Sequence, residues 1–186
     1  ITFTNKAARE MRERVGKLVS GEAAGELLVC TFHALGLKFL QIEHERAGLK
    51  RGFSVLDADD TGAIIKDLLP RALKSDQLFA LRQLVSTAKN QALTPEQALA
   101  AARSPREVEA AELYADYQRR LAAFNAVDFD DLIRLPLALL EGEDAVRAAW
   151  QERLRYLLVD EYQDTNTAQY RLLKALAGPR GAFTAV

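Results

Sequence analysis

The sequence has 186 residues, of which 49% are hydrophobic and 27% are charged, and its formal net charge is −1 at pH 7. This length allows a sizeable buried core in one domain or in two small ones. The balanced charge excludes a protein that binds nucleic acid through a basic surface overall, so any such contact must be local. The sequence contains no run of about eighteen apolar residues, and we predict no membrane span.

The amino-terminal residues alternate between strand and helix patterns. A strand is predicted at residues 1–3, followed by a helix at 6–19 that Thr4 or Asn5 can cap. A loop at residues 21–25 leads to a second buried strand at 27–31, which contains the single cysteine, Cys30, and then to a helix at 34–47. Strand, helix and strand in this order indicate the start of a parallel sheet layer.

The middle of the chain changes to a helical pattern, with no convincing strand between residues 57 and 140. Capping residues precede amphipathic runs at five places: Asp59 or Asp60, Ser75, Thr94, Ser104 and Asp128. Pro70 should disrupt the first of these helices, and Pro136 should kink or shorten the last. The aromatic stripe in the helix after Ser104 is more typical of a core than of a base-stacking surface.

The carboxyl-terminal residues return to strand and helix. A helix at residues 145–153 precedes a strand at 156–159 that we expect to be buried on both faces. A helix at 167–177, which Thr165 or Asn166 can cap, leads to a last strand at 183–186. The predicted fold is therefore α/β, with a parallel sheet built by both ends of the chain and an all-helical insertion between them. Because both ends fall within strands, we expect a piece of a longer protein.

Two carboxylates follow the predicted strand at residues 156–159. In open α/β sheets, ligands bind at the carboxyl ends of the strands, where Asp160 and Glu161 lie. Asp160 could hold Mg²⁺ and Glu161 could polarise an attacking water. The alternative is an acidic turn that closes a strand, but Gln163 and Asp164 follow at once, and this density of polar groups favours a nucleotide site.

The phosphate-binding loop G-x-x-x-x-G-K-[ST] that such a site requires is absent from the sequence. The single Gly-Lys pair, Gly16-Lys17, lies late in a helical pattern with no strand before it. We therefore do not identify it as a phosphate loop.

Four motifs resemble those of one family of motor proteins. They are TFTNKAAREM at residues 2–11, TFHALG at 31–36, VDFDDL at 127–132 and LLVDEYQDTNTAQY at 157–170. In order and spacing they are similar to the motifs of the Rep, UvrD and PcrA group of superfamily-one DNA helicases, most closely its Rep branch, over essentially the whole chain.

The resemblance implies a RecA-like, P-loop NTPase motor subdomain, 1A, at residues 1–34 and 141–186, and an inserted helical subdomain, 1B, at 35–140. It implies ATP and Mg²⁺ as cofactors and 3′ to 5′ movement along single-stranded DNA coupled to unwinding. The expected partners are single-stranded DNA and single-strand/duplex junctions, together with replication-restart or repair proteins in the bacterial cytosol, associated with the nucleoid. The oligomeric state stays open, as does whether 1B binds duplex DNA or regulates the motor.

The resemblance also implies roles for individual residues. Asp160 would bind Mg²⁺ and Glu161 would activate water, while Gln163 and Asp164 would link the nucleotide to neighbouring motifs. The residues expected along the DNA strand are Phe3, Thr4, Asn5, Lys6, Thr31, Phe32 and His33. Lys6 adds charge for a phosphate, and Phe3 and Phe32 could stack a base; the alternative for both rings is core packing.

Two other functions compete with this one. The chain could be the motor portion of a helicase–nuclease of the RecB or AddA kind, which a nuclease domain elsewhere in the protein would identify. It could also be a non-catalytic fragment that only binds DNA or a partner. Because the phosphate loop, motif III and the second motor domain, 2A, are missing from these 186 residues, we expect them alone to be inactive as an ATPase.

Overall fold

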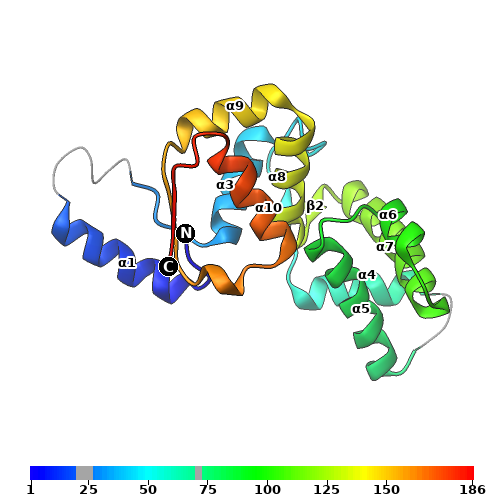
Figure 1. Ribbon diagram of the computed structural model, residues 1–186. Coiled ribbons are helices and arrows are strands. Elements are labelled where there is room, and N and C mark those ends of the chain that lie inside the picture. The colour runs from blue at the N-terminus through cyan, green and yellow to red at the C-terminus, as the bar shows by residue number, and fades with distance from the viewer. Residues whose placement is uncertain (20–26, 70–72) are drawn as a thin grey trace.

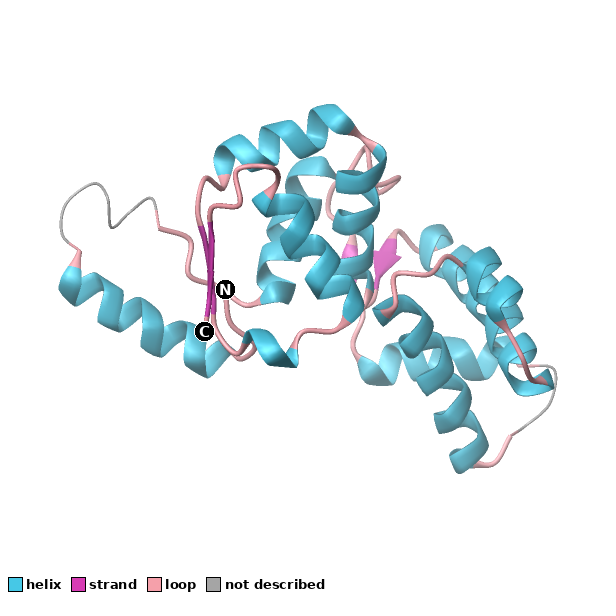
Figure 2. Ribbon diagram, in the orientation of Figure 1, coloured by secondary structure: helices cyan, strands magenta, loops and turns pink. Residues whose placement is uncertain are grey.

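The computed structural model describes residues 1–19, 27–69 and 73–186. The predicted loop at residues 21–25 and the predicted break at Pro70 lie outside these ranges. The chain forms two lobes, one that contains both termini and one built from the helices of the middle of the sequence (Figure 1). Helices dominate both lobes, and the strands are short and parallel (Figure 2).

The elements follow one another in this order. The helices are α1 (Asn5–Leu18), α3 (Phe32–Glu43), α4 (Ala58–Leu68), α5 (Ser75–Asn90), α6 (Pro95–Ala101), α7 (Pro105–Ala123), α8 (Asp131–Gly142), α9 (Asp144–Arg153) and α10 (Thr167–Ala177), with a 3₁₀ turn η1 at Tyr162–Asp164. The strands are β1 (Ser54–Val55), β2 (Ala126–Val127), β3 (Leu157–Val159) and β4 (Phe183–Ala185).

The core of the terminal lobe lies between α3, α8, α9, α10 and the inner face of β3. Phe39 on α3 packs against Trp150 on α9, with ring centroids 4.4 Å apart. Leu140 and Leu172 are at most 1% exposed. Gly36 lets α3 approach α8 closely, since a Cβ at this position would lie 1.7 Å from the carbonyl oxygen of Leu132. α1 extends away from this core (Figure 1) and buries only Ala8.

The sheet of this lobe is small. β3 and β4 pair in parallel, with Leu157 opposite Phe183, so the predicted strand at residues 183–186 is confirmed. The two amino-terminal strands are reduced to a single parallel bridge between Thr2 and Thr31. The prediction of longer strands there was wrong. Leu27 and Leu28 are exposed, and in the described residues they pair with no other strand, although their apolar side chains suggested a buried one.

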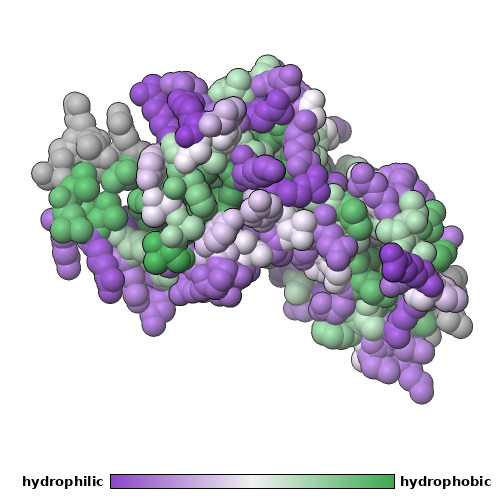
Figure 3. Space-filling view, in the orientation of Figure 1, coloured by the Kyte–Doolittle hydropathy of each residue, from purple (hydrophilic) through white to green (hydrophobic). Residues whose placement is uncertain are grey.

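The prediction that β3 is buried on both faces was also wrong. Leu157 and Val159 point into the core, but Leu158 is 61% exposed and Tyr156 is 60% exposed. Helices cover one face of β3, whereas the other face is open within the described residues. The space-filling view shows apolar surface beside the two termini, where Val186 is also exposed (Figure 3).

The helical lobe consists of α4, α5, α6 and α7 around its own core. Tyr114 and Tyr117 on α7 are at most 1% exposed and pack with Leu81 and Val85 on α5. The aromatic stripe of α7 is therefore core at Tyr114 and Tyr117, as the sequence favoured, whereas Phe124 at the end of the stripe is 56% exposed. β1 and β2 pair in parallel where the chain passes between the two lobes (Figure 2); the strand at Ala126–Val127 was not predicted.

Most helices begin where a side-chain oxygen accepts a backbone amide of the first turn, and most of the predicted capping residues are confirmed. Thr4 caps α1, Asn166 caps α10, and Thr94 with Gln97 forms a complete capping box at α6. Three cap positions differ from the predicted ones: Asp57, rather than Asp59 or Asp60, caps α4, Lys74, rather than Ser75, precedes α5, and Asp130, rather than Asp128, precedes α8. Pro136 lies inside an unbroken α8.

The two cores divide the chain at different points from the predicted domain ranges. α3 and α8, most of whose residues fall within the range 35–140, share the core of the terminal lobe with α10. The separate helical core is formed by residues between Leu56 and Ala126. The physical reason is that α3 and α8 carry apolar faces that can be buried only against each other and against α10.

Candidate functional site

The carboxylates Asp160 and Glu161 directly follow β3, as predicted. The amide of Asp160 donates to the carbonyl oxygen of Ile1 at 3.0 Å. The hydroxyl of Thr2 donates to Oδ2 of Asp160 at 3.3 Å. Thr2 is 1% exposed, so its hydroxyl lies in the protein interior. From there it orients the half-buried Asp160 carboxylate at the end of the strand. The sequence did not single out Thr2.

Glu161 has a strained backbone. Its φ of 53° and ψ of 42° lie in the left-handed region, which costs a residue with a side chain about 1–3 kcal/mol. This conformation reverses the chain direction between β3 and η1 and leaves the Glu161 carboxylate exposed to solvent. The side chain of Gln163 donates a hydrogen bond to this carboxylate, so the two predicted catalytic residues lie together, and Asp164 is exposed one residue further on.

The oxygen atoms at this strand end fit a hard divalent cation. Mg²⁺ in proteins is usually held by one or two carboxylates, with waters and substrate phosphates completing the octahedron. Asp160 supplies one such carboxylate, and Glu161 follows it. Within residues 1–19, 27–69 and 73–186 no group of three His, Cys, Asp or Glu side chains could bind a metal by itself. A metal at Asp160 would therefore need ligands from a bound phosphate or from water.

The bridge between Thr2 and Thr31 places the starts of α1 and α3 side by side. Thr4 accepts the Ala7 amide at 3.1 Å and Thr31 accepts the Ala34 amide at 3.2 Å. Each hydroxyl caps its helix and keeps a proton that it can donate. The free backbone amides and the dipoles of two neighbouring helix starts favour binding of the phosphates of a nucleic-acid strand.

The residues predicted to contact DNA differ in exposure. Thr4, Asn5 and Lys6 are exposed, and Phe3 and His33 are half-buried. Lys6 is within 4.0 Å of Glu10, but its side chain is 78% exposed. Five of the seven predicted residues are thus accessible at adjoining helix starts.

The other two residues are buried. Thr31 is 5% exposed and Phe32 is 1% exposed. The Phe32 ring packs against that of Phe3 at 5.2 Å, so the prediction that Phe32 stacks a base was wrong. Its ring fills the core because it lies on the inner side of the first turn of α3.

His33 meets an aromatic residue that the sequence analysis did not select. The ring of Phe129 lies edge-on to His33, with centroids 5.7 Å apart, and Phe129 is 52% exposed. Burial lowers the pKa of His33, and the nearby Asp130 carboxylate opposes this only in part. At neutral pH the imidazole is therefore uncharged. Phe129 lies in the VDFDDL motif that the sequence analysis identified, although the motif alone does not show that the ring is exposed.

A buried ion cluster joins the two lobes. Lys89, the last residue but one of α5, donates to Asp128 at 2.7 Å and to Asp131 at 3.0 Å. Burial alone would raise the pKa of Asp131, but Lys89 and Arg134 outweigh it and hold that pKa below its ordinary value. Burial and the Asp131 charge raise the pKa of Asp128, and the Tyr117 hydroxyl donates to it at 2.9 Å.

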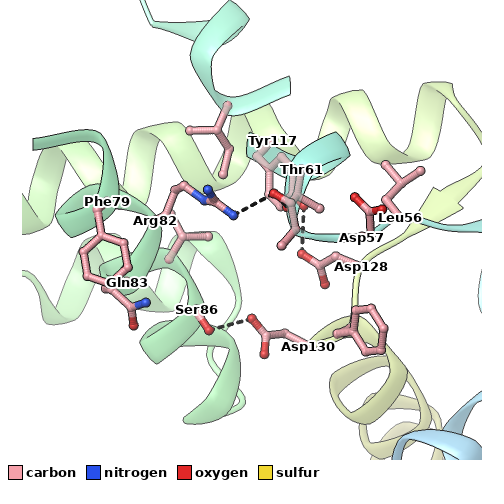
Figure 4. A pocket seen from close by; sticks show the side chains of 14 residues that line it. Leu56, Asp57, Thr61, Phe79, Arg82, Gln83, Ser86, Tyr117, Asp128 and Asp130 are labelled. Atoms are coloured by element: carbon pink, nitrogen blue, oxygen red, sulfur yellow. Dashed lines mark hydrogen bonds between the residues drawn. The ribbon is translucent and has the colours of Figure 1, made fainter. Parts of the chain in front are cut away.

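A cavity of about 260 Å³ opens between the helical lobe and the segment before α8 (Figure 4). Around it, Arg82 donates to the carbonyl oxygen of Ala58 and Ser86 donates to Asp130. Asp57, Asp128 and Asp130 line the same cavity. This negative lining does not suit a phosphate, so the carboxylates after β3 remain the candidate for a nucleotide site.

Comparison with known proteins identifies a family over the whole chain. The sequence profile of the UvrD/REP helicase N-terminal domain matches residues 1–186. ATP-dependent DNA helicase Rep of Salmonella typhimurium and that of Escherichia coli are each 48% identical over 189 residues, which cover 100% of this chain and 28% of the relative. ATP-dependent DNA helicase PcrA of Staphylococcus aureus is 42% identical over 180 residues, covering 95% of this chain and 24% of the relative. The chain thus spans about a quarter of the length of these relatives.

Proposed function

Since this chain belongs to the UvrD/REP helicase N-terminal domain family, we propose that it works as part of an ATP-dependent DNA helicase. The complete motor would couple ATP hydrolysis to 3′ to 5′ movement along single-stranded DNA and to duplex unwinding, in replication restart or repair. The observation that carries this proposal is the placement of Asp160 and Glu161 directly after β3. The hydroxyl of Thr2, which precedes the residues predicted to contact DNA, donates to the Asp160 carboxylate.

The chemistry assigned to the carboxylates follows from their positions. Asp160 would hold Mg²⁺, which neutralises charge on the β- and γ-phosphates of bound ATP. Glu161 would orient and deprotonate the water that attacks the γ-phosphate, and Gln163, hydrogen-bonded to Glu161, would fix its carboxylate. Asp164 would connect this turn to parts of the protein beyond the chain.

The strand of DNA would run over the starts of α1 and α3. Thr4, Asn5 and Lys6 offer hydroxyl, amide and ammonium donors to phosphates, and Phe3, His33 and Phe129 offer ring surface to the bases. Thr31 would contribute through the cap of α3 rather than by direct contact. The backbone of Thr2 pairs with Thr31 and so joins the two helix starts, while the hydroxyl of Thr2 donates to Asp160. Thr2 therefore contacts both the proposed DNA path and the proposed nucleotide site.

We assign the terminal lobe to the RecA-like motor subdomain 1A and the helical lobe to the inserted subdomain 1B. The two separate cores support a boundary near residues 56 and 126, so that α3 and α8 belong to 1A. Subdomain 1B would then consist of α4 to α7, beside the exposed Phe129 at the junction.

The decisive experiment is Glu161→Gln in the full-length protein that carries this chain. The expected result is a fall of about a hundredfold or more in DNA-stimulated ATP hydrolysis, with binding of ATP and single-stranded DNA retained. Glu112→Gln, at an exposed position on α7, is the matched control and should hydrolyse ATP at the original rate. Hydrolysis by Glu161→Gln at that rate would refute the assignment.

The isolated 186 residues serve as a second test. They have no G-x-x-x-x-G-K-[ST] loop to position the phosphates, so they should bind single-stranded DNA without hydrolysing ATP. DNA-stimulated hydrolysis above that of Glu161→Gln in the same chain would contradict this expectation.

A further inference from the structure

A chain of side-chain hydrogen bonds connects the start of α10 with the end of α5. Asn166 donates to the side-chain oxygen of Asn90 at 2.6 Å, across 76 residues of sequence. The amide group of Asn90 donates in turn to Asp130 at 3.1 Å. Ser86 donates to the other oxygen of Asp130 at 2.7 Å. We refer to Asn166, Asn90, Asp130 and Ser86 as the Asn90 relay.

The donors and acceptors of the relay allow one orientation of Asn90. Its oxygen accepts from Asn166, and its NH₂ group faces the Ser86 carbonyl at 2.9 Å and the Asp130 carboxylate. A rotated amide would place NH₂ against the NH₂ of Asn166 and oxygen against a carboxylate. Neither contact is a hydrogen bond, so a movement of Asp130 is transmitted to Asn166 instead of being absorbed by a flip.

The residue before Asn90 anchors the relay. Lys89 is buried and paired with both Asp128 and Asp131, so the end of α5 is fixed to the segment that contains Asp130. The end of α5 and this segment therefore move together. The Asn90 relay therefore connects α10 to the end of α5 and the segment that contains Asp130, which are held together by buried ion pairs.

Each end of the relay lies beside one half of the proposed motor. Asn166 caps α10, with its oxygen accepting the Gln169 amide at 2.9 Å, and it comes two residues after the η1 turn, whose N-cap is Glu161. At the other end, Asp130 follows Phe129, whose ring touches His33. Two hydrogen bonds, from Asn166 to Asn90 and from Asn90 to Asp130, therefore connect the nucleotide side with the DNA side.

We propose that Asn90 is a positioning residue that couples DNA contact to ATP hydrolysis. This inference rests on the proposed function. A base against Phe129 and His33 shifts Asp130, the relay carries the shift to the cap of α10, and the turn that holds Glu161 and Gln163 adjusts relative to the nucleotide. Asn90 touches neither ligand and acts only through its neighbours.

Two substitutions in the full-length protein separate this role from a structural one. Asn90→Ala removes the centre of the relay. Asn166→Asp keeps the cap of α10, because aspartate caps helices as well as asparagine, but it replaces the NH₂ donor to Asn90 by an acceptor. Steady-state ATPase rates are measured without DNA and across a titration with a single-stranded oligonucleotide, giving kcat and KM for ATP.

Each variant should reduce the stimulation of kcat by saturating DNA about fivefold or more, with KM for ATP unchanged. The double variant Asn90→Ala/Asn166→Asp should show no further reduction beyond the stronger single variant, because both remove the same contact. If Asn90→Ala does not fold, Asn166→Asp carries the test by itself.

Two results would overturn the inference. One is full stimulation in both variants; the other is an equal fall in kcat with and without DNA, which marks a structural role only. An unmodified protein whose ATPase does not respond to DNA would instead refute the proposed function, so the two failures can be told apart.

Discussion

The ammonium nitrogen of Lys89 lies 2.7 Å from a carboxylate oxygen of Asp128, and no part of the Lys89 side chain is exposed. The rings of Tyr114 and Tyr117 cover this nitrogen at 5.7 and 4.9 Å. A cation in such surroundings is tolerated only because carboxylates compensate it. The pair joins α5 of the helical lobe to the segment that leads into α8, so it ties one lobe to the other.

Replacing this lysine should destabilise the fold strongly. Lys89→Met leaves the buried Asp128 carboxylate without a cation and Asp131 with Arg134 alone, and we expect it to lower the free energy of unfolding by about 3–5 kcal/mol. Urea denaturation followed by circular dichroism measures this. The matched control is Lys66→Met, at an exposed position on α4, which should change stability by about 0.5 kcal/mol or less. Equal effects of the two substitutions would mean that the cluster is not buried in solution.

The contact between α3 and α8 predicts opposite effects for two glycines. Gly36→Ala would place a Cβ 1.7 Å from the backbone oxygen of Leu132, so the helices must separate, at a cost of about 2 kcal/mol or more. Gly16→Ala meets no described atom within 4 Å in α1 and should stabilise by about 0.5–1 kcal/mol. Thermal unfolding midpoints that shift in the same direction for both would contradict this packing.

The lowered pKa of His33 predicts a dependence of stability on pH. The unfolded chain takes up the proton near the ordinary value of 6.5, before the folded chain does. The stability that neutral His33 provides is therefore complete above pH 6.5 and is lost as the pH falls through the lower folded-state pKa. Unfolding free energies measured from pH 8 to pH 5 should fall less steeply in His33→Gln than in the original chain. Parallel curves for the two proteins would exclude His33 as the cause.

The exposed ring of Phe129 predicts a loss of DNA affinity. Phe129→Ala should weaken binding of a single-stranded oligonucleotide about 5- to 150-fold, corresponding to about 1–3 kcal/mol for one stacked base. Phe124→Ala removes a ring that is 56% exposed at the end of α7 and lies against Arg120, and it should leave affinity unchanged. Fluorescence anisotropy with a labelled oligonucleotide distinguishes the two. An equal effect of both substitutions would argue against a specific ring contact.

Much of the helical structure could be predicted because helix ends are specified locally. Thr4, Thr94 and Asn166 each cap the helix that follows within three residues, and such contacts can be read from adjacent positions. The placement of Asp160 and Glu161 at a strand end was equally accessible, since an apolar run followed at once by carboxylates contains both parts of the signal.

Features that depend on distant residues could not be predicted in the same way. Whether Leu158 is covered depends on what packs against the outer face of β3, which its neighbours in sequence do not determine. The burial of Phe32 depends on the Phe3 ring, and the cluster around Lys89 joins residues 39 and 42 positions apart. Lys89 does lie on the same helical stripe as Leu81 and Val85, so its burial, though not its partners, could have been read from the sequence.

The left-handed backbone at Glu161 lowers the stability of the fold at a residue whose side chain has a proposed catalytic role. Glycine would adopt this φ without strain, so a screen that selects only for thermal resistance should favour Glu161→Gly and, in doing so, remove the proposed water-activating carboxylate. The chain has glutamate at a position where glycine would make the folded state more stable. Directed evolution of this domain for stability would therefore need a selection for the proposed hydrolysis as well, or it would produce a stable protein without the proposed activity.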